Sequence, residues 1–213
     1  MDLRRLTIAL LISTAFLGAQ AHPRKKPKPK AKQRPSANRI VQPRFEADVI
    51  NNPQQGDLKV GDKGSGVVRA QILLNRAHFS CGEIDGEFGS NLEKALAAFQ
   101  QARKIQSGQV VDAASWAALN ADQAPAIVDY TISPEDVKGP FVKIPAEMSE
   151  QAKLPSLGYT SPLEALSERF HVAPAVLHAL NPGADFSKAG QPIHAPNVMT
   201  MPPGAAARVE VSK

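Results

Sequence analysis

The side chains best suited to chemistry in this chain of 213 residues gather between residues 78 and 87. Cys81 is the single cysteine, and His78 is the only histidine close to it in sequence. A thiolate beside a base is a nucleophile, and such a pair could support acyl transfer. Both residues fall in a short loop, however, and a loop supplies neither a substrate groove nor donors for an oxyanion. We therefore interpret Cys81 as a tolerated loop residue, and it has no second cysteine for an internal disulfide.

Acidic residues alternate directly after this cysteine, at Glu83, Asp85 and Glu87. A calcium loop needs more oxygen ligands over a longer spacing. The paired carboxylates of a glycosidase need a cleft, which a short turn does not provide. Solvated turn acids are the preferred interpretation, and a hydrolase that uses these acids stays open as an alternative.

Three histidines later in the chain, His171, His178 and His194, could meet at a metal ion. No cysteine or carboxylate pattern accompanies them, so packing or surface positions are expected instead. The sequence predicts no metal, no cofactor and no catalytic residue.

Apolar periodicity predicts three short helices around the acidic turn. Residues 65–77 form the first helix, and residues 90–104 form the second. Ser90 and Glu93 have the spacing of a capping box at the start of the second helix. Asp112 can cap a short third helix. None of these helices could bury its apolar stripe alone, so the three must share one core.

The turn and its helices resemble the family called peptidoglycan-binding domain 1, over about residues 58–120. The resemblance is carried by Leu58, Gly61, Gly64, Val67, Ile84, Asp85, Gly86, Phe88, Gly89, Phe99, Gln100, Trp116 and Leu119. The departures are Ala70, Leu92 and Ser115, where the family usually has Leu, Thr and Thr. The resemblance implies a three-helix domain at residues 57–121 that binds peptidoglycan. The contact residues that it implies are Asp85, Gly86, Phe88 and Gly89.

A strand, two helices and a second strand are predicted in the next part of the chain. Residues 127–132 alternate like a strand. A capping box at Ser161 and Glu164 begins one helix, and Pro174 opens another. Residues 189–193 then return as a short strand.

This order resembles a LysM domain, here at residues 127–199 with an irregular insertion at residues 135–157. The resemblance implies an N-acetylglucosamine groove between the loop after the first strand and the loop before the second. The contact residues that it implies are Ser133, Pro134, Glu135, Asn181, Gly183 and Gly190. The insertion enters at the first of these loops, where it would either cover or extend the groove.

The first 21 residues have the pattern of a secretory signal peptide. Arg4 and Arg5 precede an apolar run at residues 6–17, and a small-x-small cleavage pattern ends at Ala21. No cysteine lies near that position, which argues against a lipoprotein anchor. The mature chain is therefore expected in the periplasm or the cell wall, with an uncleaved anchor as the alternative.

Residues 22–44 hold nine Lys and Arg side chains, several prolines and no acid. Like charges repel and almost nothing there can be buried, so we predict a disordered tail over residues 22–56. The tail carries the basicity of the chain, whose formal net charge is +5. A flexible spacer is one interpretation, and attraction to anionic envelope polymers or lipid head groups is the other. Export, and the lack of aromatics for stacking on bases, argue against nucleic acid.

Residues 200–213 read as a linker and a lone alternating strand. The whole order of segments resembles the amino-terminal region of exported L,D-transpeptidases, but no motif like their Ser-His-Gly-Cys sequence is present. The predicted fold class is mainly α, with a small three-helix domain and a small α+β module. The predicted function is non-catalytic attachment to peptidoglycan through two modules. The alternatives are a truncated L,D-transpeptidase without its catalytic domain and a periplasmic adaptor that binds protein.

Overall fold

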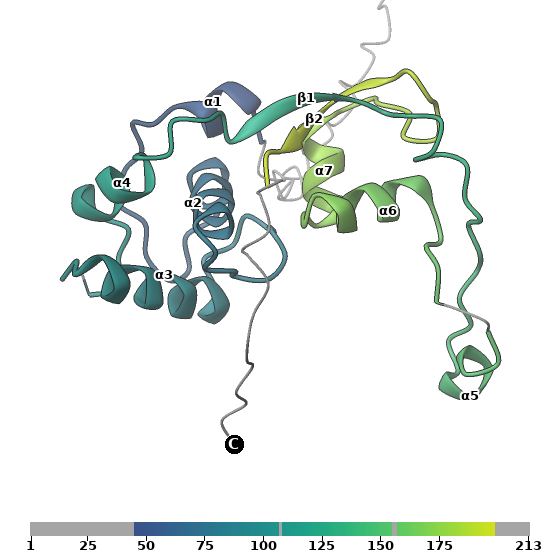
Figure 1. The fold of residues 1–213 in the computed structure, drawn as a ribbon, viewed down its shortest axis with the longest axis horizontal. Helices are drawn as coiled ribbons and strands as arrows, with labels where there is room; N and C mark the ends of the chain where they lie inside the picture. The colour runs from purple at the N-terminus through teal and green to yellow at the C-terminus, as the bar shows by residue number, and fades with distance from the viewer. Residues whose placement is uncertain (1–44, 107, 155–156, 199–213) are drawn as a thin grey trace, which may run out of the picture. The chain divides into compact units, whose positions relative to one another are not determined.

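The structure is a computed structural model that describes residues 45–106, 108–154 and 157–198 (Figure 1). These residues belong to one compact unit. The predicted signal peptide, the tail up to residue 44 and the terminal strand lie outside the described residues. No helix within the described ranges is long and apolar enough to cross a membrane.

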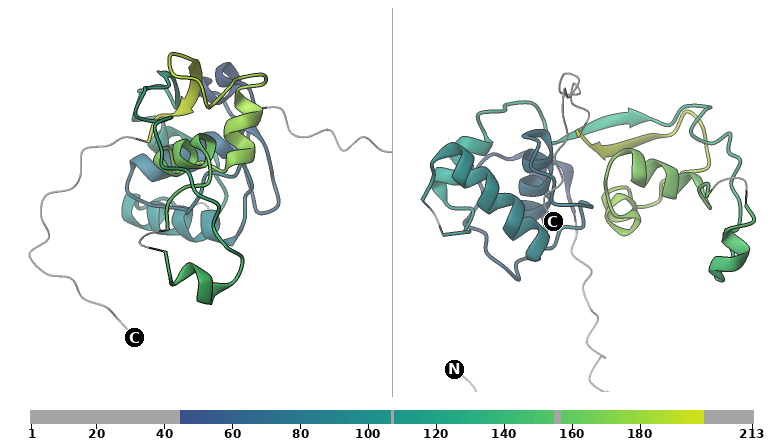
Figure 2. Two further views of the ribbon diagram at one scale, coloured as in Figure 1. Left: turned by 90° about the vertical axis from the view of Figure 1, so that its right-hand side faces the viewer. Right: turned by 60° about the horizontal axis from the view of Figure 1, so that its bottom comes forward.

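The described chain is mostly helical and contains one two-stranded sheet. Its elements in order are α1 (Ala47–Asn51), α2 (Ser65–Arg76), α3 (Ser90–Arg103), α4 (Ala113–Leu119), β1 (Ile127–Thr131), α5 (Met148–Gln151), α6 (Pro162–Arg169), α7 (Pro174–Leu180) and β2 (Pro192–Pro196). Strands β1 and β2 are antiparallel, with Ile127 opposite Pro196 and Thr131 opposite Pro192. Helices α6 and α7 lie along one face of this pair (Figures 1 and 2).

Local signals place two of the helix starts as expected. The Asp112 carboxylate accepts a hydrogen bond from the Ser115 amide at 2.9 Å and caps α4. The Ser161 hydroxyl accepts one from the Glu164 amide at 3.2 Å and caps α6. These two predicted caps are confirmed.

The capping box predicted at Ser90 is wrong. The N-cap of α3 is Gly89, whose carbonyl accepts the hydrogen bond from the Glu93 amide at 3.0 Å. Ser90 therefore lies inside the first turn, and no side chain caps this end of the helix.

Helix α2 is buried on two sides, although its sequence pattern predicted a single apolar face. Val67 and Leu74 pack in one core cluster with residues of α3 and α4, including Phe99. Val68 and Ile72 pack in a second cluster that also holds Leu166, Phe170 and Leu177 from α6, α7 and the turn between them. The helix thus separates two cores, and the second core joins the family-like helices to the β1–β2 part of the chain.

Backbone hydrogen bonds strengthen this junction. The Ile84 amide donates to the His171 carbonyl at 2.8 Å, and the Ala173 amide donates to the Ile84 carbonyl at 3.0 Å. Ile84 and Val172 form an isolated parallel bridge, and the Ile84 side chain is fully buried in the shared core. The acidic turn is therefore tied directly to the segment between α6 and α7.

Part of the predicted tail is folded. Residues 47–51 form α1, and the side chains of Phe45 and Ile50 are buried in the shared core. The buried guanidinium of Arg69 donates to the Ile50 carbonyl at 3.0 Å and to the Asn120 side chain at 2.6 Å. The prediction of disorder is wrong for the end of the tail. Phe45 and Ile50 pack against residues that are distant in sequence, and no local pattern indicates this burial.

Candidate functional site

The acidic turn is held by one buried glutamine. From α2, the Gln71 amide nitrogen donates to Asp85 Oδ1 at 2.8 Å. The Gln71 side-chain oxygen accepts from the Gly86 amide at 2.9 Å. The Glu87 amide also donates to Asp85 Oδ1, at 2.8 Å. One carboxylate oxygen of Asp85 is thus used to fix the turn.

Gly86 is required at its position by both conformation and space. Its φ is +73°, and a Cβ there would lie 2.9 Å from the Phe45 ring and 3.1 Å from a Val68 methyl. Its carbonyl accepts a hydrogen bond from the Gly64 amide at 2.9 Å. The glycine therefore lets the Phe45 ring and the turn approach closely.

The other two implied contact residues in this turn differ in exposure. The Phe88 side chain is buried in the core with α2, α3 and α4, so it shapes the turn and is not available to a ligand. Gly89 is exposed, and a Cβ added to it would meet no other atom within 4 Å. Of the four implied contact residues, Asp85 and Gly89 are the two that face solvent.

A groove of about 330 Å³ runs along this turn. It is lined by Gln71, Cys81, Glu83, Asp85, Glu87, Gly89, Ser90, Asn91 and Leu92. No Lys or Arg is among these lining residues, and the nearby Lys63 ammonium pairs with Glu87 at 2.6 Å. The groove is thus rich in oxygen acceptors, so it suits ligands that offer hydroxyl, amide or ammonium donors.

The Cys81 thiol lines this groove but is poorly suited to nucleophilic attack. Its side chain is buried, and burial raises the pKa of the Cys81 thiol to about 11, so it is protonated at neutral pH. The sulfur lies 3.9 Å from the Gln71 carbonyl oxygen, while His78 is exposed. The loop position was predicted; the burial was not, because the side chain turns into the core of the three helices.

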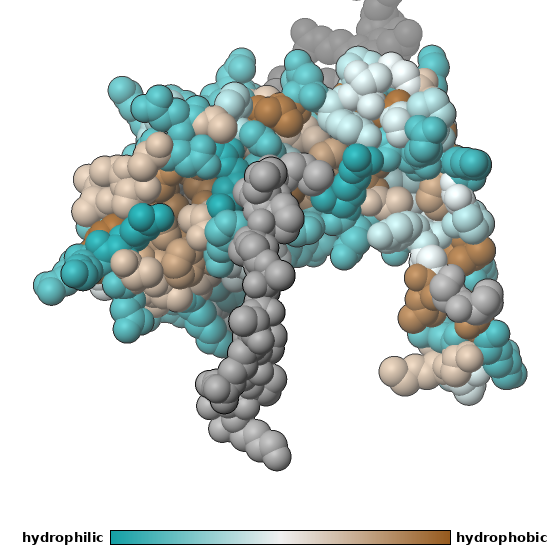
Figure 3. Space-filling view, viewed as in Figure 1, coloured by the Kyte–Doolittle hydropathy of each residue, from teal (hydrophilic) through white to brown (hydrophobic). Residues whose placement is uncertain are grey.

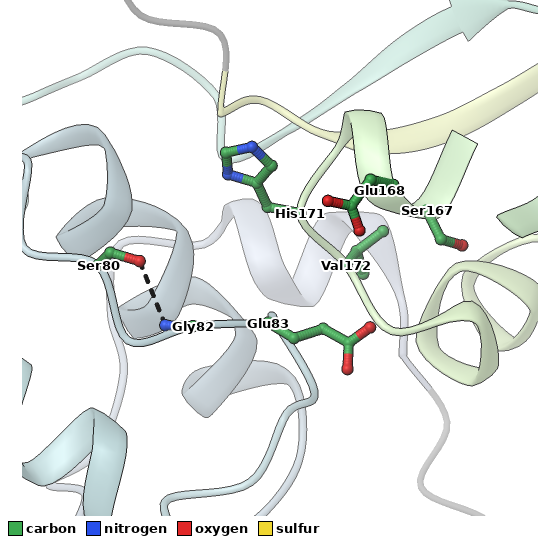
Figure 4. A pocket seen from close by; sticks show the side chains of 7 residues that line it. All are labelled: Ser80, Gly82, Glu83, Ser167, Glu168, His171 and Val172. Atoms are coloured by element: carbon green, nitrogen blue, oxygen red, sulfur yellow. Dashed lines mark hydrogen bonds between the residues drawn. The ribbon is translucent and has the colours of Figure 1, made fainter. Parts of the chain in front are cut away.

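A second hollow of about 300 Å³ adjoins the same turn through Glu83. Figure 4 shows Ser80, Gly82 and Glu83 on one side and the α6 residues with His171 and Val172 on the other. The His171 ring nitrogen lies 3.5 Å from the Asn75 amide nitrogen. Sequence reasoning missed that Glu83 and His171 line one hollow, because the long-range bridge between Ile84 and Val172 brings their segments together.

The implied contact residues of the second half lie in two loops that meet at one point. Ser133 is half-buried, and Pro134 and Glu135 are exposed. The Gly190 amide donates to the Ile132 carbonyl at 2.8 Å, which brings the loop before β2 beside the end of β1. Gly183 is exposed in a left-handed conformation, with a φ of +82°.

Asn181 holds the end of α7 to β2 through hydrogen bonds of its side chain. Its side chain is buried, and its amide nitrogen donates to the Leu177 carbonyl at 2.9 Å and the His194 carbonyl at 2.8 Å. Its oxygen accepts from the His194 amide at 2.7 Å. Asn181 thus connects α7 to β2. Both polar atoms of its side chain are engaged in these structural hydrogen bonds, so the residue has a structural role.

The three histidines occupy separate places. His194 pairs with Asp129 at 2.9 Å, and the ring of His178 lies near Phe186. Among the described residues, no group of three or more His, Cys, Asp or Glu side chains is placed to hold a metal ion.

Asp136, which sequence reasoning missed, organises the loop after β1. Its Oδ2 accepts from the Tyr130 hydroxyl at 2.6 Å and the Ser133 amide at 2.8 Å, and its Oδ1 pairs with Arg169 at 2.8 Å. Burial opposes ionisation of this carboxyl, but the bonds from Tyr130 and Ser133 and the Arg169 charge outweigh it. The pKa of Asp136 therefore lies below its usual range.

Acid should weaken the fold partly through this residue. A depressed pKa stabilises the folded state above the ordinary Asp pKa of about 3.9, and that stability is lost as pH falls through the folded value. We expect Asp136→Asn to cost about 2 kcal/mol at neutral pH, because it loses a charged acceptor. Urea unfolding from neutral pH to below pH ~4 should then show a shallower decline for the variant than for the wild type. Parallel declines would contradict the assignment.

One comparison with known proteins bears on these findings. Residues 63–119 match a family model described as "Putative peptidoglycan binding domain". The match spans α2, the acidic turn, α3 and α4, so it contains the whole groove along the turn. Residues 63–119 are therefore a domain of this peptidoglycan-binding family.

Proposed function

We propose that the protein is exported and attaches non-covalently to peptidoglycan. The observation that carries this proposal is the family match at residues 63–119, which encloses a hydrogen-bonded turn with an acceptor-rich groove. Peptidoglycan offers sugar hydroxyls, amide N–H groups and free amines, which are the donors that such a groove accepts. The signal-peptide pattern of residues 1–21 supports a place in the periplasm or the cell wall.

The second half is proposed to be an additional wall-binding module. The support is its order of strand, helices and strand, and its resemblance to a LysM domain. A LysM-like module after a peptidoglycan-binding domain also resembles the non-catalytic front of L,D-transpeptidases. The alternative function is therefore that the two modules hold such a catalytic domain on its substrate.

The proposed role is binding without catalysis. A transpeptidase of that type needs a thiolate and a base that activates it. Cys81 is the only thiol of the chain, and its burial keeps it protonated. The basic tail is proposed to add a salt-sensitive attraction to anionic envelope polymers or lipid head groups.

Sacculus binding tests the proposal, with Glu83→Lys as the informative variant. Glu83 is exposed and lines the groove, so its replacement removes an acceptor without opening the core. The protein of residues 22–213 should sediment with purified sacculi at moderate salt, which screens the tail. Glu83→Lys should weaken this binding by at least about tenfold, or about 1.4 kcal/mol.

Asp57→Lys is the matched control, because it makes the same charge change at an exposed position outside the groove. It should bind sacculi like the wild type. A wild-type protein that stays in the supernatant would refute peptidoglycan binding. Equal losses in both variants would mean that net charge, and not the groove, governs attachment.

A further inference from the structure

A pocket of about 470 Å³ lies outside the family-matched residues. It is lined by Glu135, Asp136, Gly139, Pro140, Phe141, Gly158, Tyr159, Ala165 and Arg169. Its walls are thus the loop after β1, the two limbs of the insertion and one face of α6. Of the six contact residues of the groove that the sequence resemblance implied, Glu135 lines this pocket and the other five do not, so the two sites share only the edge at Glu135.

The insertion limbs are fastened where they form the pocket. The Val142 amide donates to the Tyr159 carbonyl at 3.0 Å, which joins the outgoing limb to the returning one. The Thr160 amide donates to Glu164 Oε2 at 2.6 Å, and the Thr160 hydroxyl also bonds to this oxygen. Tyr159 is therefore held next to α6 by bonds on both sides of it.

One wall of the pocket is aromatic and apolar. The Tyr159 side chain is 42% exposed, and Phe141 beside it is half-buried. Apolar residues gather on this insertion above α5 (Figure 3). Exposed aromatic faces next to fixed polar groups are typical of small-ligand sites.

The opposite wall is polar, and its one arginine is paired with one of its two acids. Asp136, only 8% exposed, pairs with Arg169, which is 46% exposed and stacks over the Tyr130 ring at 5.2 Å. The pair leaves donors of the guanidinium fork facing outward without leaving a net charge. Glu135 adds one exposed acceptor. The wall can therefore bond to hydroxyl and amide groups, but it does not attract a carboxylate.

We propose that this pocket binds one or two pyranose rings of an uncharged saccharide. The C–H face of a pyranose would lie on Tyr159 and Phe141, and its hydroxyl or amide groups would meet Glu135 and Arg169. The inference rests on the proposed attachment to peptidoglycan and assigns the glycan strand, rather than the acidic stem peptides, to this pocket. It also gives the insertion a role, since the insertion supplies the aromatic wall.

The test is titration of the residue 22–213 protein with N-acetylglucosamine tetramer, followed by amide chemical shifts in NMR. Shifts should centre on residues 135–141 and 158–169. Tyr159→Ala should weaken binding at least about tenfold, and Glu135→Gln should weaken it about threefold. Met148→Ala is the control, because this exposed side chain lies on α5 and does not line the pocket. Glu135 is exposed, so its variant keeps the test valid if Tyr159→Ala fails to fold.

Cellotetraose, which lacks the acetamido groups, tests whether the pocket requires them. Binding equal to that of the N-acetylglucosamine tetramer would assign the pocket to pyranose rings in general. Shifts caused by a free stem tetrapeptide at these residues, with none from the sugar, would overturn the proposal. Wild-type affinity in both pocket variants would also overturn it. Failure of this inference is distinguishable from failure of the proposed function. In the first case the wild type still sediments with sacculi, and in the second it does not.

Discussion

Removing residues 22–56 should lower the free energy of unfolding by about 5 kcal/mol, whereas removing residues 22–44 should leave it unchanged. The difference lies in Phe45 and Ile50, whose side chains are buried in the core that joins the two halves. Burying a large apolar side chain contributes about 1.5–3 kcal/mol, and both are lost together. The longer deletion also removes the carbonyls of α1 that accept hydrogen bonds from the buried Arg69 guanidinium.

Urea unfolding of the two deletions, followed by circular dichroism, measures this difference. A loss of this size is comparable to the whole stability of many domains, so the longer deletion should be largely unfolded. Ile50→Ala in the full mature chain separates side-chain packing from chain length, and it should cost about 2–5 kcal/mol. Equal stability of both deletions would show that α1 does not belong to the folded unit.

Replacing Ile84 by Ala should destabilise both halves of the chain together, by about 2–5 kcal/mol. Ile84 is fully buried where the acidic turn meets the α6–α7 segment, so the smaller side chain leaves a cavity in the shared core. The shared core contains residues of both halves, so unfolding of one half should remove the core of the other and the two should unfold together.

The chain provides separate spectroscopic reporters for this test. Trp116, the single tryptophan, reports on the family-matched helices, and Tyr130 reports on the β1–β2 half. Tryptophan fluorescence and near-ultraviolet tyrosine circular dichroism should give coincident urea transitions, both shifted equally by Ile84→Ala. Val60→Ala, at an exposed position, should change stability by less than about 0.5 kcal/mol. Two separate transitions would contradict a common core.

The helices of the family-matched part were predictable because their signals are local. Residues 65–77 were predicted where α2 spans Ser65–Arg76, and residues 90–104 where α3 spans Ser90–Arg103. Apolar spacing and the Asp112 cap act over three to four residues, so they can be seen in the sequence. The N-cap of α3 was predicted wrongly as Ser90. The Gly89 carbonyl accepts the hydrogen bond from the Glu93 amide, so Gly89 is the N-cap and Ser90 is the first helical residue.

The candidate site was predicted only in part. The Asp85-Gly86 turn was identified from its residue types, and the contacts that hold it were not. Gln71 bonds to both of these residues from another element, and the Phe45 ring packs on Gly86 from outside the family-like region. Such contacts have no sequence spacing to show them.

The sequence by itself determined the resemblance to a peptidoglycan-binding family, three helices around an acidic turn, and the first strand beyond them. These features follow from periodicity, capping and turn chemistry, which are encoded within a few residues. The second strand was predicted at residues 189–193, whereas β2 spans Pro192–Pro196. Only the tertiary structure decided that α2 is buried on two sides and that Cys81 is buried and protonated. It also decided that the insertion and α6 enclose a pocket. The physical reason is that burial depends on which distant segments meet, as Ile84 meets His171 and Tyr159 meets the α6 face.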